Sequence, residues 1–337
     1  KEPKDKKALH RAIWNFNESP IAIIIANNAV EIYNGFMFNK ASKLLEHLGG
    51  KEYLDDFEYF KLVTGKTWEK YQEQLSHKNR VDYKLLCNIK VAQELLKEQG
   101  LSQSLANKLI GKIIFYRYLI DRQVTLNYQG KEHWTNEDLC LCLSNKDDFF
   151  AFVLYLENRF NGDMFQIDQN DYQKISQSAL NVLCRLLKSE DLISGQQSLF
   201  NIYDFSILPI EFISNVYEKF IGVDKQDEES AYYTPTFLVD YIVAETVGKK
   251  LSADETNYNC RILDPSCGSG IFLVESLRRI IEKYKKVENI TETNTELFRE
   301  GLRQLVLKNI YGIDKDYDAI QVAIFSIYLT LLDYQEP

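Results

Sequence analysis

The sequence predicts a chain that is α/β and α in class, with three parts in order. These are a small N-terminal α/β piece (1–80), a central all-helical domain (81–222), and the first part of a second α/β domain (223–337). Three observations predict this order: an apolar β-branched run after residue 20, long segments of helical apolar spacing in the centre, and a short strand followed by a glycine turn near residue 268.

Composition and charge exclude several classes of protein. Hydrophobic residues make up 45% and charged residues 26% of the 337 positions, which excludes wholesale disorder and collagen-like repeats. No apolar run reaches the ~18 residues of a membrane helix and no signal peptide opens the chain, so we expect no membrane partner. Six scattered cysteines suggest reduced thiols in a cytoplasm, and the Cys140–Cys142 spacing alone does not predict a metal site.

Charge is divided unevenly along the chain. Residues 1–130 contain 20 Lys and Arg against 15 Asp and Glu, whereas residues 131–337 contain 20 against 34, a net charge of −14. The first part can attract phosphate by its net charge, or its charges can form an ordinary solvated surface; the second part will not attract phosphate by its net charge.

The N-terminal piece begins with a helix and two strands. Apolar residues at helical spacing come first, at Leu9, Ile13 and Phe16. Ile21–Ala26 is a β-branched run, the Asn27–Asn28 pair is typical of a turn, and Val30–Tyr33 alternates before Asn34 and Gly35. This pattern predicts a helix followed by a β-hairpin.

The central region has the period of helices. Apolar residues recur every three or four positions at Leu105, Leu109, Ile113, Tyr116 and Ile120, at Phe149, Phe152, Val153, Tyr155 and Leu156, and at Leu180, Leu183 and Leu187. We expect its aromatic residues to form a helical core. A polar, charged stretch at 223–231 marks a boundary or loop.

The second α/β domain opens with a candidate ligand-binding turn. Ile262 and Leu263 form a short buried strand, Asp264 stands at its carboxyl end, Gly268-Ser269-Gly270 makes the turn, and a helix begins at Ile271. Ligands of open α/β sheets bind at such a strand-to-helix turn, where small residues let them approach the backbone.

The residues of this turn narrow the class of ligand. A P-loop needs Gly-Lys-Ser/Thr, but Ile271 follows Gly270, and a dinucleotide fingerprint needs a third glycine where Leu273 stands. A turn that carries a carboxylate and has no phosphate site suits the cationic S-adenosylmethionine. The alternative is an ordinary tight turn that binds no ligand. A second strand, Ile310–Ile313, ends in Asp314, an acid well placed to accept hydrogen bonds from ribose hydroxyls.

Three motifs carry a resemblance to a known family. Asp264–Leu273 resembles, almost letter for letter, the cofactor motif of the adenine-specific amino DNA methyltransferases of restriction–modification systems. Ala231–Pro235 is similar to the segment that opens their catalytic domain, and residues 207–221 resemble the preceding helix. The resemblance implies a Rossmann-like S-adenosylmethionine-dependent methyltransferase domain. It leaves a type I modification subunit and a type IIG fused restriction–methylation enzyme as alternatives.

The resemblance also implies the site residues and partners. It assigns cofactor binding to Tyr232, Tyr233, Thr234, Pro235, Asp264, Ser266, Gly268, Ser269, Gly270, Phe272 and Asp314. S-adenosyl-L-methionine is the implied cofactor and double-stranded DNA the implied partner, with a specificity or restriction subunit left open.

One departure from the family decides the expected activity. The family's Asn/Asp-Pro-Pro-Tyr/Phe motif holds the flipped adenine, and this sequence contains no Pro-Pro. We therefore predict no catalytic residue here and expect the N-terminal part of a longer enzyme, inactive alone. The alternative is a non-catalytic DNA-binding or assembly module with a vestigial methyltransferase fold.

The first 80 residues leave a nuclease origin open. Fused restriction–methylation enzymes carry an Asp…Glu-x-Lys nuclease domain, and residues 14–38 resemble part of it weakly. Glu58 and Lys61, like Glu94 and Lys97, have the wrong spacing for that motif. No metal ligand is predicted, and Mg²⁺ is expected only if an upstream nuclease domain is active.

Overall fold

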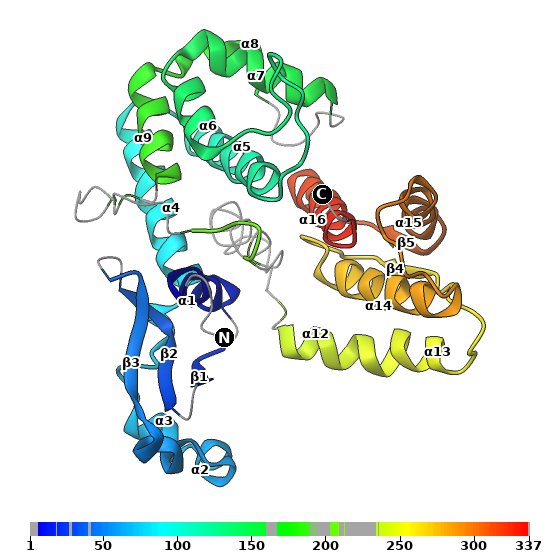
Figure 1. Ribbon diagram of the computed structural model, residues 1–337. Helices are drawn as coiled ribbons and strands as arrows, with labels where there is room; N and C mark the ends of the chain where they lie inside the picture. The colour runs from blue at the N-terminus through cyan, green and yellow to red at the C-terminus, as the bar shows by residue number, and fades with distance from the viewer. Residues whose placement is uncertain are drawn as a thin grey trace. The chain divides into compact units, whose positions relative to one another are not determined.

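The computed structural model consists of two compact units (Figure 1). The first unit is residues 1–106, 113–150 and 173–209, and the second is residues 107–112, 151–172 and 210–337. The structure describes residues 6–17, 19–26, 29–39, 42–159, 167–188, 190, 192, 203–208, 212, 234 and 236–335. The predicted turn at 27–28, the loop at 223–231 and most of the helix at 207–221 lie outside these residues.

A three-stranded antiparallel sheet follows the first helix, which confirms the predicted helix and hairpin strands. The elements are α1 (Lys6–Phe16), β1 (Ile21–Ala26), β2 (Ala29–Asn39) and β3 (Leu44–Gly50), with β2 in the centre. β2 continues past Gly35, where we expected the strand to end. The Gly35 N–H donates to the Pro20 carbonyl (2.9 Å), and a Cβ at Gly35 would clash with the carbonyl oxygen of Ser19. Gly35 is therefore needed for a close backbone approach inside the sheet.

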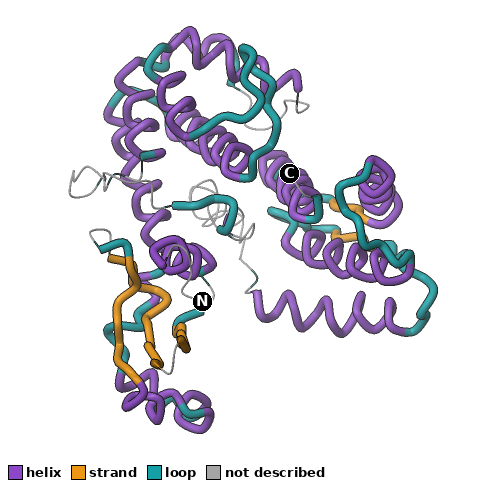
Figure 2. The backbone as a smooth tube through the Cα atoms, in the orientation of Figure 1, coloured by secondary structure: helices purple, strands orange, loops and turns teal. Residues whose placement is uncertain are grey.

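Helices dominate the described residues between 51 and 187 (Figure 2), and within the described part of 81–222 they confirm the predicted helical region. Ser102, Thr135 and Ser176 begin three of them, because each side chain accepts a hydrogen bond from the backbone N–H three residues on. The elements are η1 (Lys51–Phe57), α2 (Tyr59–Val63), α3 (Lys66–Lys70), η2 (His77–Asn79), α4 (Val81–Glu98), α5 (Gln103–Asp121), α6 (Asn136–Leu143), α7 (Lys146–Arg159), α8 (Gln169–Lys174) and α9 (Gln177–Leu187).

The C-terminal part of the second unit contains a parallel pair of strands. Ile262 pairs with Ile310, Leu263 with Tyr311 and Asp264 with Gly312. Both predicted strands are confirmed, but the expected burial of the first is wrong, because Leu263 is largely exposed. The helix between α14 and β5 was not predicted. The elements are α12 (Thr236–Val243), a π-helical turn η3 (Ala244–Gly248), α13 (Lys249–Ser252), β4 (Ile262–Asp264), α14 (Ile271–Val287), α15 (Glu296–Asn309), β5 (Ile310–Gly312) and α16 (Tyr317–Asp333).

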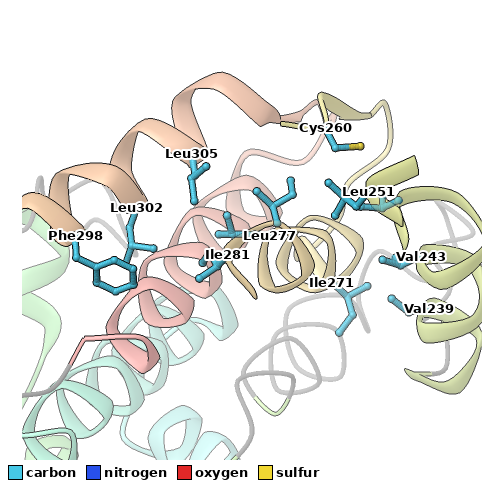
Figure 3. Close-up of a cluster of buried hydrophobic side chains, with 12 residues drawn as sticks. Val239, Val243, Leu251, Cys260, Ile271, Leu277, Ile281, Phe298, Leu302 and Leu305 are labelled. Atoms are coloured by element: carbon cyan, nitrogen blue, oxygen red, sulfur yellow. The ribbon is translucent and has the colours of Figure 1, made fainter. Parts of the chain in front are cut away.

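One hydrophobic cluster joins these helices to the strands (Figure 3). Leu277, Ile280 and Ile281 form the buried face of α14. They pack in the cluster with Val239, Val243, Val247 and Leu251 from α12 to α13, with Cys260 and Ile271, and with Phe298, Leu302 and Leu305 from α15. Each fully buried leucine or isoleucine contributes about 1.5–3 kcal/mol. The cluster thereby fixes the first turn of α14 against the end of β4.

The two faces of the strand pair differ. Ile262 and Ile310 are paired and pack against this cluster. The next pair points to the other face, where Leu263 is 60% and Tyr311 46% exposed. Ile313, just past β5, is also exposed. Parallel sheets are normally covered on both faces, whereas one face of this pair is open to solvent.

Candidate cofactor site

The glycine turn between β4 and α14 has a conformation that requires glycine. Gly268 has φ +50° and Gly270 has φ +86°, both in the left-handed region. Gly270 is the N-cap of α14, and a Cβ there would lie 2.8 Å from Cβ of Ala323 in α16. The sequence predicted this turn, but the role of Ala323 was missed, because a contact across 53 positions of chain leaves no local signal.

Asp314 ties the turn to the second strand. Its Oδ2 accepts a hydrogen bond from the Gly268 N–H (2.8 Å), and its Oδ1 accepts one from the Asp316 N–H (2.9 Å). The Ile313 backbone adds two further bonds, since its N–H donates to the Asp264 carbonyl (2.9 Å) and its carbonyl accepts from the Cys267 N–H (3.0 Å). Each carboxylate oxygen can accept a second hydrogen bond, so Asp314 keeps acceptor capacity for a ligand.

Asp264 lies beside the same turn, at the carboxyl end of β4. Its Oδ1 accepts a hydrogen bond from the Ser266 N–H (3.1 Å), which closes a short turn, while Gly270 occupies the N-cap position of α14. The half-buried carboxyl group therefore belongs to the mouth of the turn and does not cap the helix.

The thiol of Cys267 is buried close enough to both carboxyl groups to feel their charge. Burial, followed by the negative charges of Asp314 and Asp264, raises the pKa of Cys267 to about 11, so the thiol is neutral at pH 7. A Cβ at Gly312 would meet Cδ1 of Leu273 at 2.8 Å and Sγ of Cys267 at 2.9 Å, so this layer is closely packed. The formal charge of the turn is negative, which favours a cationic ligand over a phosphate.

The structure brings seven of the predicted residues to this one strand–helix junction. Ser269 is buried, and Phe272 packs against the hydrophobic cluster behind the turn. The seven are Asp264, Ser266, Gly268, Ser269, Gly270, Phe272 and Asp314. Thr234 is half-buried two residues before α12, and Tyr232, Tyr233 and Pro235 lie outside the described residues. A cofactor role for each of these residues stays a prediction.

In the part of the chain that the structure describes, no group of three or more His, Cys, Asp or Glu side chains is arranged to hold a metal ion. Cys140 and Cys142 are buried on α6, and burial raises the pKa of Cys142 to about 12, as for a thiol in a helical core. No helix in the same residues combines the length and the hydropathy needed to cross a bilayer.

Comparison with known proteins identifies similar sequences. The family model of the MmeI DNA-methyltransferase domain matches residues 245–336. The chain is 26% identical, over 74% of its length, to the type II restriction enzyme and methyltransferase RM.Eco57I of Escherichia coli. It is 22% identical, over 87% of its length, to the putative type II restriction enzyme and methyltransferase RM.MjaORFECS2P of Methanocaldococcus jannaschii.

A third relative covers a shorter stretch. The type II methyltransferase M.BanIII of Aneurinibacillus aneurinilyticus is 35% identical over 31% of this chain and 14% of its own length. The chain spans 26% of RM.Eco57I and 31% of the Methanocaldococcus protein. No solved structure matches the chain.

Proposed function

Because the chain resembles type IIG-like restriction–modification methyltransferases, we propose that it is part of a DNA adenine methyltransferase. The complete enzyme would transfer a methyl group from S-adenosylmethionine to the exocyclic amino group of adenine. The observation that carries the proposal is the junction of β4 and α14, where a glycine turn lies between the carboxyl groups of Asp264 and Asp314.

The residues present fit this cofactor. Gly268 and Gly270 have no side chain that would keep a ligand from the backbone, and the Ser269 side chain between them is buried. No P-loop lysine is present to favour phosphate. Asp264 would hold the cationic methionine part, and Asp314 would accept hydrogen bonds from ribose hydroxyls. When bound, the cofactor supplies an electrophilic methyl group on a sulfonium, and the two carboxyl groups bind and orient it.

We propose further that the methyltransferase domain is incomplete in these residues. The open face of the β4–β5 pair supports this, because Leu263 and Tyr311 lie where a Rossmann-like sheet carries another helical layer. The missing Asn/Asp-Pro-Pro-Tyr/Phe motif supports it as well, since that motif holds the flipped base. A segment outside these residues would then complete the sheet and supply the catalytic residues.

The proposed reaction has an expected substrate and location. The substrate is double-stranded DNA and the location is the cytoplasm. The similarity to fused enzymes favours one polypeptide that also cuts DNA over a separate restriction subunit. Mg²⁺ would enter only through an active nuclease domain.

The experiment uses the full-length protein that contains this chain. Tritiated S-adenosylmethionine and genomic DNA are followed by nucleoside analysis, and we expect label in N6-methyladenine. Calorimetry with S-adenosylhomocysteine tests the cofactor site separately. Asp264→Ala should weaken its binding about 10- to 150-fold, the equivalent of the ~1.5–3 kcal/mol of a charged hydrogen bond.

Three results would contradict the proposal. Label in a methylated cytosine would refute adenine specificity. Failure of the full-length protein to bind S-adenosylhomocysteine would favour a vestigial fold in an assembly module. Equal affinities of the wild-type protein and the Asp264→Ala variant would remove Asp264 from the site.

A further inference from the structure

A basic groove lies at the amino ends of β4 and β5, the edge opposite the candidate cofactor site. Its volume is about 690 Å³. Arg261 directly precedes β4, and Asn309 directly precedes β5. The residues that line it include Lys250, Asn259, Arg261, Lys308, Asn309 and Tyr311. The two edges of the strand pair therefore carry opposite charge, with Asp264 and Asp314 at the carboxyl ends.

The three cations of this basic groove differ from the arginines of α14 and α15. Arg278, Arg299 and Arg303 pair with glutamates one turn away on their own helices. Among the described residues, the side chains of Lys250, Arg261 and Lys308 form no ion pair or hydrogen bond, and no carboxylate lines the groove. Three uncompensated positive charges therefore gather at one place in a part of the chain with a net charge of −14.

A buried amide holds the walls of the groove in place. Asn309 is fully buried, and its Nδ2 donates to the Leu305 carbonyl (2.9 Å) and to Oδ1 of Asn259 (3.3 Å). Its Oδ1 accepts from the Cys260 N–H (2.8 Å). These bonds join the last turn of α15 to the segment before β4. Arg261 and Lys308 consequently project from backbone that is fixed on both sides of the groove.

The stability of the fold explains only some of the cations in the groove. Lys308 stands in the last turn of α15, where a cation interacts favourably with the helix dipole. That reason does not apply to Arg261, which precedes a strand. A layer that covers the open face of the sheet cannot also seal the groove, because burying three unpaired cations is strongly unfavourable.

We propose that this basic groove binds the phosphodiester backbone of DNA, at a contact separate from the edge that would receive the target adenine. Lysine and arginine side chains neutralise backbone phosphates without reading the bases, so the contact is independent of sequence. A local cluster is needed because the net charge of this part of the chain repels DNA. The inference rests on the proposed function in taking DNA as the partner.

The test measures the salt dependence of DNA binding by this chain. A fluorescein-labelled duplex of arbitrary sequence is titrated by anisotropy from low to moderate salt. The groove variant is Arg261→Gln with Lys308→Gln, and the control is Lys283→Gln with Lys286→Gln, the same loss of charge on α14. Each lost phosphate contact lowers the slope of log Kobs against log salt by about 0.9. We expect a slope lower by about 1–2 for the groove variant and an unchanged slope for the control.

Matched variants keep the result interpretable. Arg261→Lys with Lys308→Arg keeps the charge and should bind as the wild type does, and thermal melts compare the folding of all four proteins. Equal slopes for the groove and control variants, or no binding by the wild type at low salt, would overturn the inference. A further outcome would overturn it too: pyrophosphate raises the melting temperature of the wild type but not of the groove variant, while both proteins bind DNA with equal affinity. The groove would then bind small phosphates and not DNA.

The inference and the proposed function can fail separately. If the full-length protein methylates adenine while the groove variant binds DNA as tightly as the control, the groove is wrong and the function stands. If the groove variant alone loses DNA affinity while the full-length protein neither binds S-adenosylhomocysteine nor transfers methyl groups, the groove stands and the function is wrong.

Discussion

Gly270 and Gly268 have similar backbone conformations but different surroundings. Both have positive φ, yet a Cβ at Gly268 would meet nothing within 4 Å, whereas a Cβ at Gly270 would press on Ala323. The pair therefore separates two requirements for glycine in one turn, a left-handed backbone and a close approach of two helices.

We expect Gly270→Ala to destabilise the chain more than Gly268→Ala. Both substitutions place an L side chain in the left-handed region, at a cost of about 1–2 kcal/mol. Gly270→Ala adds overlap with Ala323, at roughly 1–3 kcal/mol more. Urea unfolding of both variants measures the difference in the free energy of unfolding. Equal losses would mean that α16 moves away without cost.

The two carboxyl groups should contribute differently to folding. Asp314 accepts backbone hydrogen bonds at both oxygens, whereas Asp264 accepts one, from the exposed Ser266. Without cofactor, Asp314→Ala should lower the free energy of unfolding by about 1.5–3 kcal/mol, and Asp264→Ala by only about 0.5–1.5 kcal/mol. Asp314→Asn, which keeps one acceptor oxygen, should fall between. A larger loss for Asp264→Ala, measured by denaturant titration, would reverse these structural roles.

At the scale of elements, prediction succeeded where the signal was local. β4 and the start of α14 could be predicted, because an apolar pair, an acid and two glycines follow each other within ten residues. β5 could be predicted because a short apolar segment ends in Asp314. β3 was missed, since Leu44–Gly50 contains His47 and two glycines and becomes a strand only by pairing with β2. At the candidate site the positions of Asp264, Gly268 and Asp314 at the strand ends and the turn could be predicted from the sequence. The hydrogen bond that the Gly268 N–H donates to Asp314 could not, because it depends on the parallel register.

A partly buried ion pair between α5 and α7 provides an element-scale prediction. Lys112 is 2% exposed, and its Nζ donates to Oε1 of Glu157 (2.7 Å). Burial lowers the pKa of Lys112 below 10.5, although Glu157 opposes the shift. The unfolded chain then binds more protons than the folded one, so this group should make stability rise with pH between the lowered pKa and 10.5.

Lys112→Met should remove that contribution. The free energy of unfolding of the wild type minus that of the variant should increase through the alkaline range, as measured by urea titration at several pH values. Taking the difference cancels tyrosines and cysteines, which titrate in both proteins. A flat or falling difference would show that Glu157 outweighs burial and keeps the pKa of Lys112 unshifted or raised.

At the scale of the whole molecule, the open sheet face and the small share of the relatives covered support the same interpretation. Leu263 and Tyr311 are exposed in a strand pair whose class is normally buried. The chain covers 26% of RM.Eco57I and 31% of the Methanocaldococcus protein. Both facts support the proposal that the cofactor site needs residues from outside this chain.

We therefore expect this chain alone to bind S-adenosylhomocysteine weakly or not at all, and to transfer no methyl group. Without one wall of the pocket, the binding free energy is less favourable by about 25 cal/mol for each Å² of apolar surface that the wall would bury. Calorimetry on the isolated chain, with a tritium-transfer assay on genomic DNA, measures both outcomes. Micromolar or tighter binding, or incorporation above background, would contradict the incompleteness proposed above.

The parallel pairing of β4 with β5 also sets an order of events during synthesis. Ile262 and Ile310 are 48 positions apart, with α14 and α15 between them. Closing so long a loop is entropically unfavourable, and parallel pairs form late in folding for this reason. During synthesis, the Gly268 N–H cannot form its hydrogen bond until Asp314 has left the ribosome. We therefore expect the candidate cofactor turn to be among the last parts of its unit to become ordered.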